Sequence, residues 1–135
     1  MSLQKPSPIM SVLSVGISYD KKLIVTGGFD KTVKLWDMET KELIRTFEGH
    51  KDWVVTVYIN PDCTRIVSQS YDRSMIFWDV KTGEVINKYV FHPDWISRVS
   101  MSPDGKWIVG IDRDGSLIMF DVNTGKAENV ITQEV

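Results

Sequence analysis

Residues 30–60 read DKTVKLWDMETKELIRTFEGHKDWVVTVYIN and hold two dipeptides, Trp36-Asp37 and Gly49-His50, each at the border of an apolar run. Trp78-Asp79 follows the first Trp-Asp pair by 42 residues, and Phe120-Asp121 follows 42 residues after that. A constant step of this size indicates that the chain is built from repeats.

Several other residues advance by the same step, which makes a chance match in composition a poor explanation. They are Asp20, Asp62 and Asp104; Asp30, Asp72 and Asp114; His50 and His92; Trp53 and Trp95; and Gly83 and Gly125. Repeats of roughly 40 to 45 residues are typical of propeller blades or of helical arrays. The type of element inside each repeat must therefore decide between the two.

The apolar runs inside the repeats predict strands. In the second repeat, residues 53–60, 65–70, 74–80 and 84–90 are short and rich in Val, Ile, Tyr, Phe and Trp, as β-strands require. No window places apolar residues at helical spacing over three turns. The sequence therefore predicts an all-β fold.

Turn residues separate these runs at fixed places in the repeat. In NPDCT and SPDGK, Pro presets φ and Asp caps its own backbone. Glycine at two turn positions predicts φ above zero there, and other residues stand at the same positions in other repeats. The two sets are Lys21, Cys63 and Gly105, and Lys41, Gly83 and Gly125. Lys41 would hold such a φ at a cost of roughly 1 kcal/mol.

Composition excludes several classes of protein. The 135 residues carry a net charge of −2, too small to argue for nucleic acid binding. No apolar run approaches the ~18 residues of a membrane-spanning helix, and the start, MSLQKPSPIM, lacks the apolar core of a signal peptide. The single Cys63 cannot form an internal disulfide, which fits a reducing compartment. We therefore expect a cytoplasmic protein, with the nucleus left open, that contacts neither nucleic acid nor membrane.

The order Gly-His, strand, Asp-containing turn, strand and Trp-Asp resembles the WD-repeat β-propeller family over about residues 9–132. The resemblance implies blades of four antiparallel strands, named a to d from the inside outwards. It places three blades at residues 9–48, 49–90 and 91–135, after an extended leader at 1–8.

The resemblance also implies a buried polar chain within each blade, made by a His, a Ser or Thr, an Asp and a Trp. The second repeat carries the full set as His50, Ser68, Asp72 and Trp78. Such a chain would satisfy the indole N–H and stabilise the blade. The outer repeats are incomplete: Thr26, Asp30 and Trp36 match in the first, where Pro8 replaces His, and His92 and Asp114 match in the third, where Gly110 and Phe120 replace the other two.

No residue set indicates catalysis. His50 and His92 stand at the structural His position, and DRDG at residues 112–115 aligns with the other b–c turns and lacks the Glu of a calcium loop. The sequence offers no phosphate loop, no metal-ligand spacing and no nucleophile motif. We therefore expect a protein without enzymatic activity, cofactor or metal.

With catalysis not indicated, the residues left to consider are those that could form a binding surface. In the family, ligands usually meet the face that carries the d–a and b–c loops, and aromatic and Arg residues anchor protein interfaces. The resulting candidates for partner binding are Phe29, Tyr71, Arg113, Lys51, Trp53, Asp94 and Trp95. Alternatively, Trp53 and Trp95 close the inner end of strand a against neighbouring blades. The sequence favours a protein-interaction scaffold for protein or peptide partners, with a purely structural assembly piece as the alternative.

Three blades are too few to close a propeller, which typically has about four to eight. Two copies placed head to tail would give six blades, and this contact closes because three blades of six turn through half a circle. We therefore expect a homodimer that forms a six-bladed ring. The alternative is a larger or heteromeric propeller in which other blades come from elsewhere.

Overall fold

The computed structural model of the chain describes residues 12–91, 98–111 and 115–131. Twelve strands form three separate four-stranded antiparallel sheets, each with its strands in chain order. The strands are β1 (Val12–Ile17), β2 (Leu23–Gly28), β3 (Thr32–Asp37) and β4 (Leu43–Glu48); β5 (Val54–Ile59), β6 (Arg65–Ser70), β7 (Ser74–Asp79) and β8 (Val85–Val90); and β9 (Val99–Met101), β10 (Trp107–Ile111), β11 (Leu117–Asp121) and β12 (Ala127–Ile131). The predicted all-β fold of three four-stranded sheets is confirmed.

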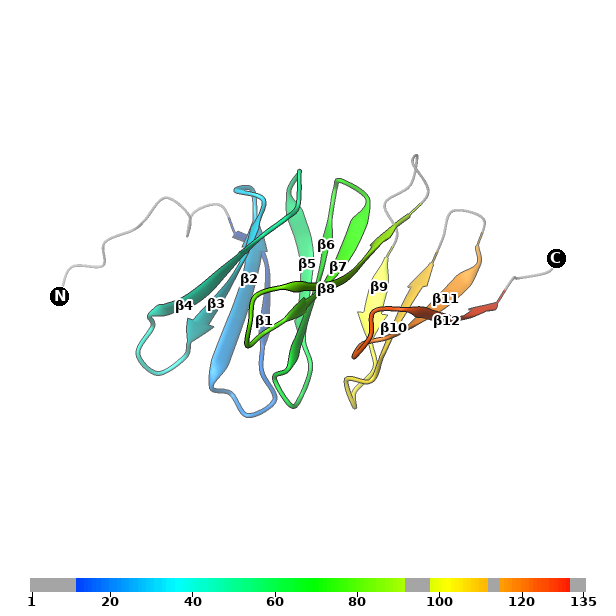
Figure 1. Ribbon diagram of the computed structural model, residues 1–135. Coiled ribbons are helices and arrows are strands. Elements are labelled where there is room, and N and C mark those ends of the chain that lie inside the picture. The colour runs from blue at the N-terminus through cyan, green and yellow to red at the C-terminus, as the bar shows by residue number, and fades with distance from the viewer. Residues whose placement is uncertain (1–11, 92–97, 112–114, 132–135) are drawn as a thin grey trace.

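The three sheets follow one another in a row, with the first at the N-terminal side and the third at the C-terminal side (Figure 1). We call the face of each sheet that points toward the N-terminal end of the row its front, and the face that points toward the C-terminal end its back. Within the described ranges, no helix is long and apolar enough to cross a membrane.

Two apolar clusters hold the row together. One joins the back of the first sheet to the front of the second and includes Val25, Leu35, Phe47, Ile66, Ile76 and Trp78. The other joins the back of the second sheet to the front of the third and includes Val67, Met75, Phe77, Ile108, Ile118 and Phe120. The hydrophobic core therefore lies between sheets, not within any one of them.

Burial along the central strands reflects this arrangement. In the second sheet, every residue from Ile66 to Ser70 and from Ser74 to Trp78 is buried. In β3 and β11, burial alternates between buried and half-buried residues, because only one face of each outer sheet is covered. The middle sheet alone has two covered faces.

The predicted left-handed turn residues are confirmed. Lys21, Lys41 and Cys63 have φ of 64°, 66° and 62°, and the glycines at the matching positions are also positive. A third set, which the sequence did not reveal, lies in the b–c turns: Lys31, Arg73 and Gly115, with φ of 71°, 71° and 88°. All three turn types thus need this conformation, and the first sheet adopts it with lysine each time.

Candidate functional site

An exposed aromatic cluster lies across the first and second sheets. Phe29 stands in the b–c turn between β2 and β3, Trp53 directly precedes β5, and Tyr71 directly follows β6. The Phe29 and Trp53 rings meet edge to face with centroids 4.4 Å apart, and the Trp53 and Tyr71 centroids are 5.6 Å apart. The three side chains remain 40%, 42% and 40% exposed, respectively. Three predicted site residues thus form one continuous surface.

The strand order explains why these residues meet. In an antiparallel meander, the b–c turns and the d–a connections lie at the same end of every sheet, and the a–b and c–d turns lie at the other. Tyr71 is held to Trp53 by a backbone hydrogen bond, N to O, of 3.0 Å. Trp53 packs on Phe29 of the neighbouring sheet and is still 42% exposed. It therefore closes strand a against its neighbour and also presents surface.

Of the other four candidates for partner binding, only Lys51 lies within the described residues. Lys51 is exposed at the same end, and its backbone N–H donates to Asp72 over 2.8 Å. Asp94, Trp95 and Arg113 lie outside the described residues. Their predicted part in partner binding stays a prediction.

Beneath this surface, the second sheet contains the polar chain. The Trp78 indole Nε1 donates to Ser68 Oγ over 2.8 Å, Ser68 Oγ lies 2.7 Å from His50 Nε2, and His50 Nδ1 lies 3.2 Å from Asp72 Oδ2. Because the Asp72 carboxylate can only accept, the neutral His50 carries its proton on Nδ1, and its Nε2 then accepts from the Ser68 hydroxyl. Ser68, His50 and Trp78 are all buried. These hydrogen bonds connect the strands and loops of the blade, and the groups offer no open surface to a substrate.

Ser74 also joins this chain and was not predicted. Its hydroxyl lies 2.5 Å from Asp72 Oδ1 and 3.0 Å from His50 Nδ1. A signal was present in the sequence, because Thr32, Ser74 and Ser116 place a hydroxyl at this position in all three repeats. Two residues after an Asp, such a hydroxyl extends the Asp-capped turn.

The surroundings of His50 and Asp72 set their charges. Burial lowers the pKa of His50 below its ordinary value of 6.5, although the Asp72 charge and hydrogen bond oppose this. Burial alone would raise the pKa of Asp72, but hydrogen bonds from the Ser74 hydroxyl and from the Lys51 and Ser74 amides outweigh it and lower the pKa to about 2. At neutral pH the pair is therefore a neutral imidazole beside a carboxylate.

The outer sheets hold only parts of the chain. In the first, Trp36 Nε1 donates to Thr26 Oγ1 over 3.0 Å, while Asp30 binds Lys34 Nζ at 2.6 Å instead of an imidazole. In the third, Gly110 supplies no hydroxyl and Phe120 no N–H. Pro8, His92 and Asp114 lie outside the described residues.

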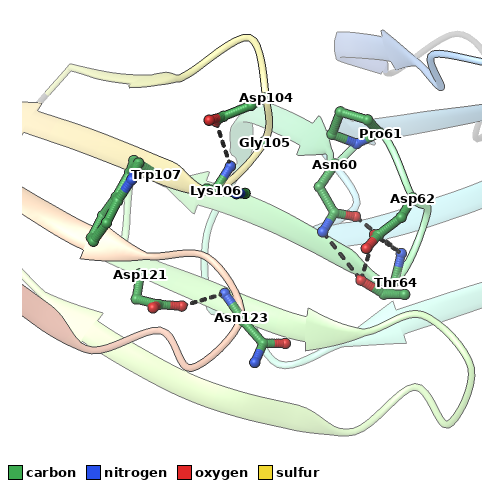
Figure 2. A pocket seen from close by; sticks show the side chains of 10 residues that line it. All are labelled: Asn60, Pro61, Asp62, Thr64, Asp104, Gly105, Lys106, Trp107, Asp121 and Asn123. Atoms are coloured by element: carbon green, nitrogen blue, oxygen red, sulfur yellow. Dashed lines mark hydrogen bonds between the residues drawn. The ribbon is translucent and has the colours of Figure 1, made fainter.

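At the opposite end, a recess of about 400 Å³ lies between the turns of the second and third sheets (Figure 2). Asp62 Oδ1 accepts from Thr64 N at 3.1 Å, and Asp104 Oδ1 accepts from Lys106 N at 3.0 Å. These carboxylates close their own turns. No set of three or more His, Cys, Asp or Glu side chains in the described part of the chain could hold a metal ion. The sequence did not predict this recess, because it depends on how two turns pack together.

Known proteins similar to this chain share its repeats. The family described as WD domain, G-beta repeat matches residues 5–37, 41–79 and 83–121. Each of the last two segments starts just before strand d of one sheet and ends at strand c of the next. The sequence repeat is thus offset by one strand from the sheets.

Individual relatives match over short stretches. Nuclear distribution protein PAC1-2 of Postia placenta is 45% identical over 38 residues, which cover 28% of this chain and 9% of that protein. A probable E3 ubiquitin ligase complex SCF subunit, scon-2, of Neurospora crassa is 38% identical over 50 residues, which cover 37% of this chain and 8% of that protein. Coatomer subunit beta'-1 of Arabidopsis thaliana is 43% identical over 42 residues, which cover 31% of this chain and 5% of that protein.

The matched stretches cover no more than a tenth of each of these relatives. The family match is far broader, because its three segments take up most of the chain. Together with the three four-stranded sheets, it shows that the chain belongs to the WD-repeat family, with three WD repeats.

Proposed function

We propose that the chain is a non-catalytic interaction scaffold whose aromatic cluster, made of Phe29, Trp53 and Tyr71, anchors a protein or peptide partner. The observation that carries this proposal is the exposure of three touching aromatic rings at one end of a rigid pair of sheets. Aromatic side chains are enriched among the residues that contribute most to binding energy. Exposed apolar side chains that adjoin one another mark interaction sites more often than scattered ones do.

The names of two relatives support the scaffold proposal, since coatomer subunit beta'-1 and the SCF subunit scon-2 are both described as subunits of complexes. The buried polar chain supports it in another way. It fixes the loop before β5, which carries Lys51, to the b–c turn at Asp72. The surface is therefore preorganised, which lowers the entropy lost on binding. We place the protein in the cytoplasm or nucleus, consistent with its single free Cys63.

Partner capture followed by binding with purified components tests this proposal. Trp53→Ala and Tyr71→Ala should each abolish capture and leave the circular dichroism unchanged. Tyr19→Ala is the matched control, because Tyr19 is an 83% exposed aromatic residue in the a–b turn at the opposite end. If all three variants bind the identified partner as well as the unmodified chain does, the cluster is not the site. If the unmodified chain captures no specific partner, the result supports the alternative, a purely structural assembly piece.

We also propose that the scaffold acts as a six-bladed ring of two copies. This proposal rests on the outer sheets, each of which has one face that no described residue covers, whereas the middle sheet is covered on both. Light scattering coupled to gel filtration measures the mass. A species of twice 15.5 kDa supports the ring. A stable monomer would instead favour a larger or heteromeric propeller completed by other blades.

A further inference from the structure

The rows of side chains that pack between sheets continue onto the two outer faces of the chain. We propose that the back of the third sheet of one copy seats on the front of the first sheet of a second copy, and that Lys41 keeps this junction wider than the two junctions inside the chain. The inference rests on the two-copy ring proposed above.

The front of the first sheet offers a preformed receptor. An apolar pocket of about 260 Å³ opens on it, lined by Val12, Ile24, Thr26, Trp36, Asp37 and Lys41. Trp36 is only half-buried there. Its counterpart Trp78, 42 residues later, is fully buried in the junction between the first and second sheets.

Inside the chain, the aromatic residue of strand c is always covered by aromatic residues of the preceding sheet. Phe47 covers Trp78 with ring centroids 5.5 Å apart. Phe77 and Tyr89 cover Phe120 at 6.0 Å and 4.8 Å. Trp36 occupies the same place in the first sheet, and no described residue covers it in this way. Its pocket is therefore shaped for the back of another blade of this kind.

The back of the third sheet supplies an apolar surface, with Met119 in place of the aromatic Phe77. Val109, Leu117 and Met119 point away from the second sheet and are half-buried. Their counterparts in the second sheet are Val67, Met75 and Phe77, which are buried against the third sheet. A second copy is thus the occupant that brings one uncovered back to one uncovered front, and two such contacts close a ring.

The c–d turns show how closely neighbouring sheets approach inside the chain. A Cβ added to Gly125 would lie 2.6 Å from Asn87 Cβ and 2.9 Å from the Phe77 ring. A Cβ added to Gly83 would lie 2.7 Å from Nη1 of Arg45. Strand d of the second sheet therefore passes directly over Gly125, whereas the Arg45 side chain alone reaches Gly83.

Hydrogen bonds lock this approach in place. Arg45 donates to the carbonyl oxygens of Lys81 and Thr82 at 3.0 Å and 3.2 Å, and Asn87 donates to the carbonyl oxygen of Gly125 at 2.8 Å. Both donors lie 42 residues apart on strand d. At both internal junctions, this position of strand d thus donates to carbonyl oxygens of the neighbouring c–d turn.

Lys41 interrupts this pattern on the front of the first sheet. Its turn has the same geometry, since Lys41 N donates to Asp37 O at 2.8 Å, as Gly83 N does to Asp79 O. Its φ of 66° is close to the 79° and 73° of Gly83 and Gly125. The Lys41 Cβ therefore stands where an incoming strand d would pass. The junction between copies must stay wider at this end, and weaker than those inside the chain.

Sedimentation equilibrium of the full chain over a wide concentration range tests this inference. Lys41→Gly should tighten the dimer by about tenfold or more, because it removes a Cβ that overpacks each of the two junctions. A tenfold change corresponds to about 1.4 kcal/mol. Lys31→Gly is the matched control, because it relieves the same left-handed φ in the b–c turn, at the opposite end of the first sheet from Lys41. It should leave the dimer constant unchanged.

A second pair of variants probes the opposite surface. Met119→Glu should give a monomer, because it places a charge on the back of the third sheet. Val90→Glu is its control, since the first repeat carries Glu48 at the matching position of strand d. An unmodified chain that stays at 15.5 kDa at every concentration overturns the ring and this inference together. A dimer that survives Met119→Glu does the same, because the ring needs the back of the third sheet. A dimer that responds equally to Lys41→Gly and Lys31→Gly overturns the role of Lys41 and leaves the ring standing.

Discussion

His50 Nε2 and Ser68 Oγ lie 2.7 Å apart in the middle sheet, and this contact joins the loop before β5 to the strand that carries the core of the sheet. Replacing His50 by Ala removes one hydrogen-bond partner from the Ser68 hydroxyl and one from the Asp72 carboxylate. A typical hydrogen bond contributes ~0.5–1.5 kcal/mol, and one to a charged group more. We therefore expect His50→Ala or Asp72→Ala to lower the free energy of unfolding by ~2 kcal/mol or more in urea titrations.

His92→Ala is the comparison for this prediction. The third repeat has Gly110 and Phe120 where the second has Ser68 and Trp78, so less of a polar chain can depend on His92. Loss of the His92 side chain should therefore lower the free energy of unfolding by less than loss of the His50 side chain does. Equal losses at His50 and His92 would show that the polar chain does not explain the stability of the middle sheet.

Acidification should weaken the protein through His50. Burial holds the pKa of His50 below its ordinary 6.5, so the unfolded chain takes up a proton at a higher pH than the folded chain does. The stabilising contribution of the neutral His50 is complete above pH 6.5, and it is lost as the pH falls below this value. His50→Gln cannot titrate and should show a flatter dependence of unfolding free energy on pH between 7.5 and 5.5. Parallel curves for the two proteins would contradict this assignment.

The left-handed lysines should be replaceable with a gain in stability. Lys31 holds φ of 71° in the first b–c turn, where the third repeat has Gly115. Lys31→Gly should raise the free energy of unfolding by up to ~1 kcal/mol, the usual cost of this conformation for a residue with a Cβ. Urea unfolding measures the gain, and Lys51→Gly, at an exposed lysine outside the positive-φ set, should show none. A destabilised Lys31→Gly would mean that the lysine side chain contributes more than its backbone strain removes.

The two turn glycines should differ in their tolerance of alanine. At Gly125 an added Cβ meets Asn87 Cβ and the Phe77 ring, neither of which can yield easily, whereas at Gly83 it meets only the flexible Arg45 side chain. Both replacements carry the same backbone strain. We expect Gly125→Ala to cost ~2–4 kcal/mol and Gly83→Ala ~1–2 kcal/mol, as measured by thermal unfolding. Equal costs would indicate that φ alone requires glycine at this position.

The sequence predicted the sheets because each cue lies within a few residues. Short apolar runs, turns with Asp and Gly, and a constant step of 42 residues identify strands and their order without knowledge of the packing. The left-handed b–c turns at Lys31 and Arg73 were missed for the same local reason, since lysine and arginine give no sign of positive φ.

The candidate site was predicted only in part. The resemblance to the WD-repeat family implied that His50, Ser68, Asp72 and Trp78 form one set, and their hydrogen bonds are present in the structure. The contact of Trp53 with Phe29 depends on how the first sheet packs on the second, so the sequence placed both residues at one end but not ring to ring. The recess between the turns near Pro61 and Gly105 has the same origin.

The middle sheet, buried on both faces from Ile66 to Ser70 and from Ser74 to Trp78, ties the unfolding of the whole chain together. Neither face can leave water until the sheet beside it has formed, so the three blades stabilise one another as neighbours in a repeat array do. A chain shortened by one blade would lose more than a third of its stability, because it would lose a complete junction. We therefore expect one cooperative transition for the three blades, with fraying confined to the uncovered faces of the outer two.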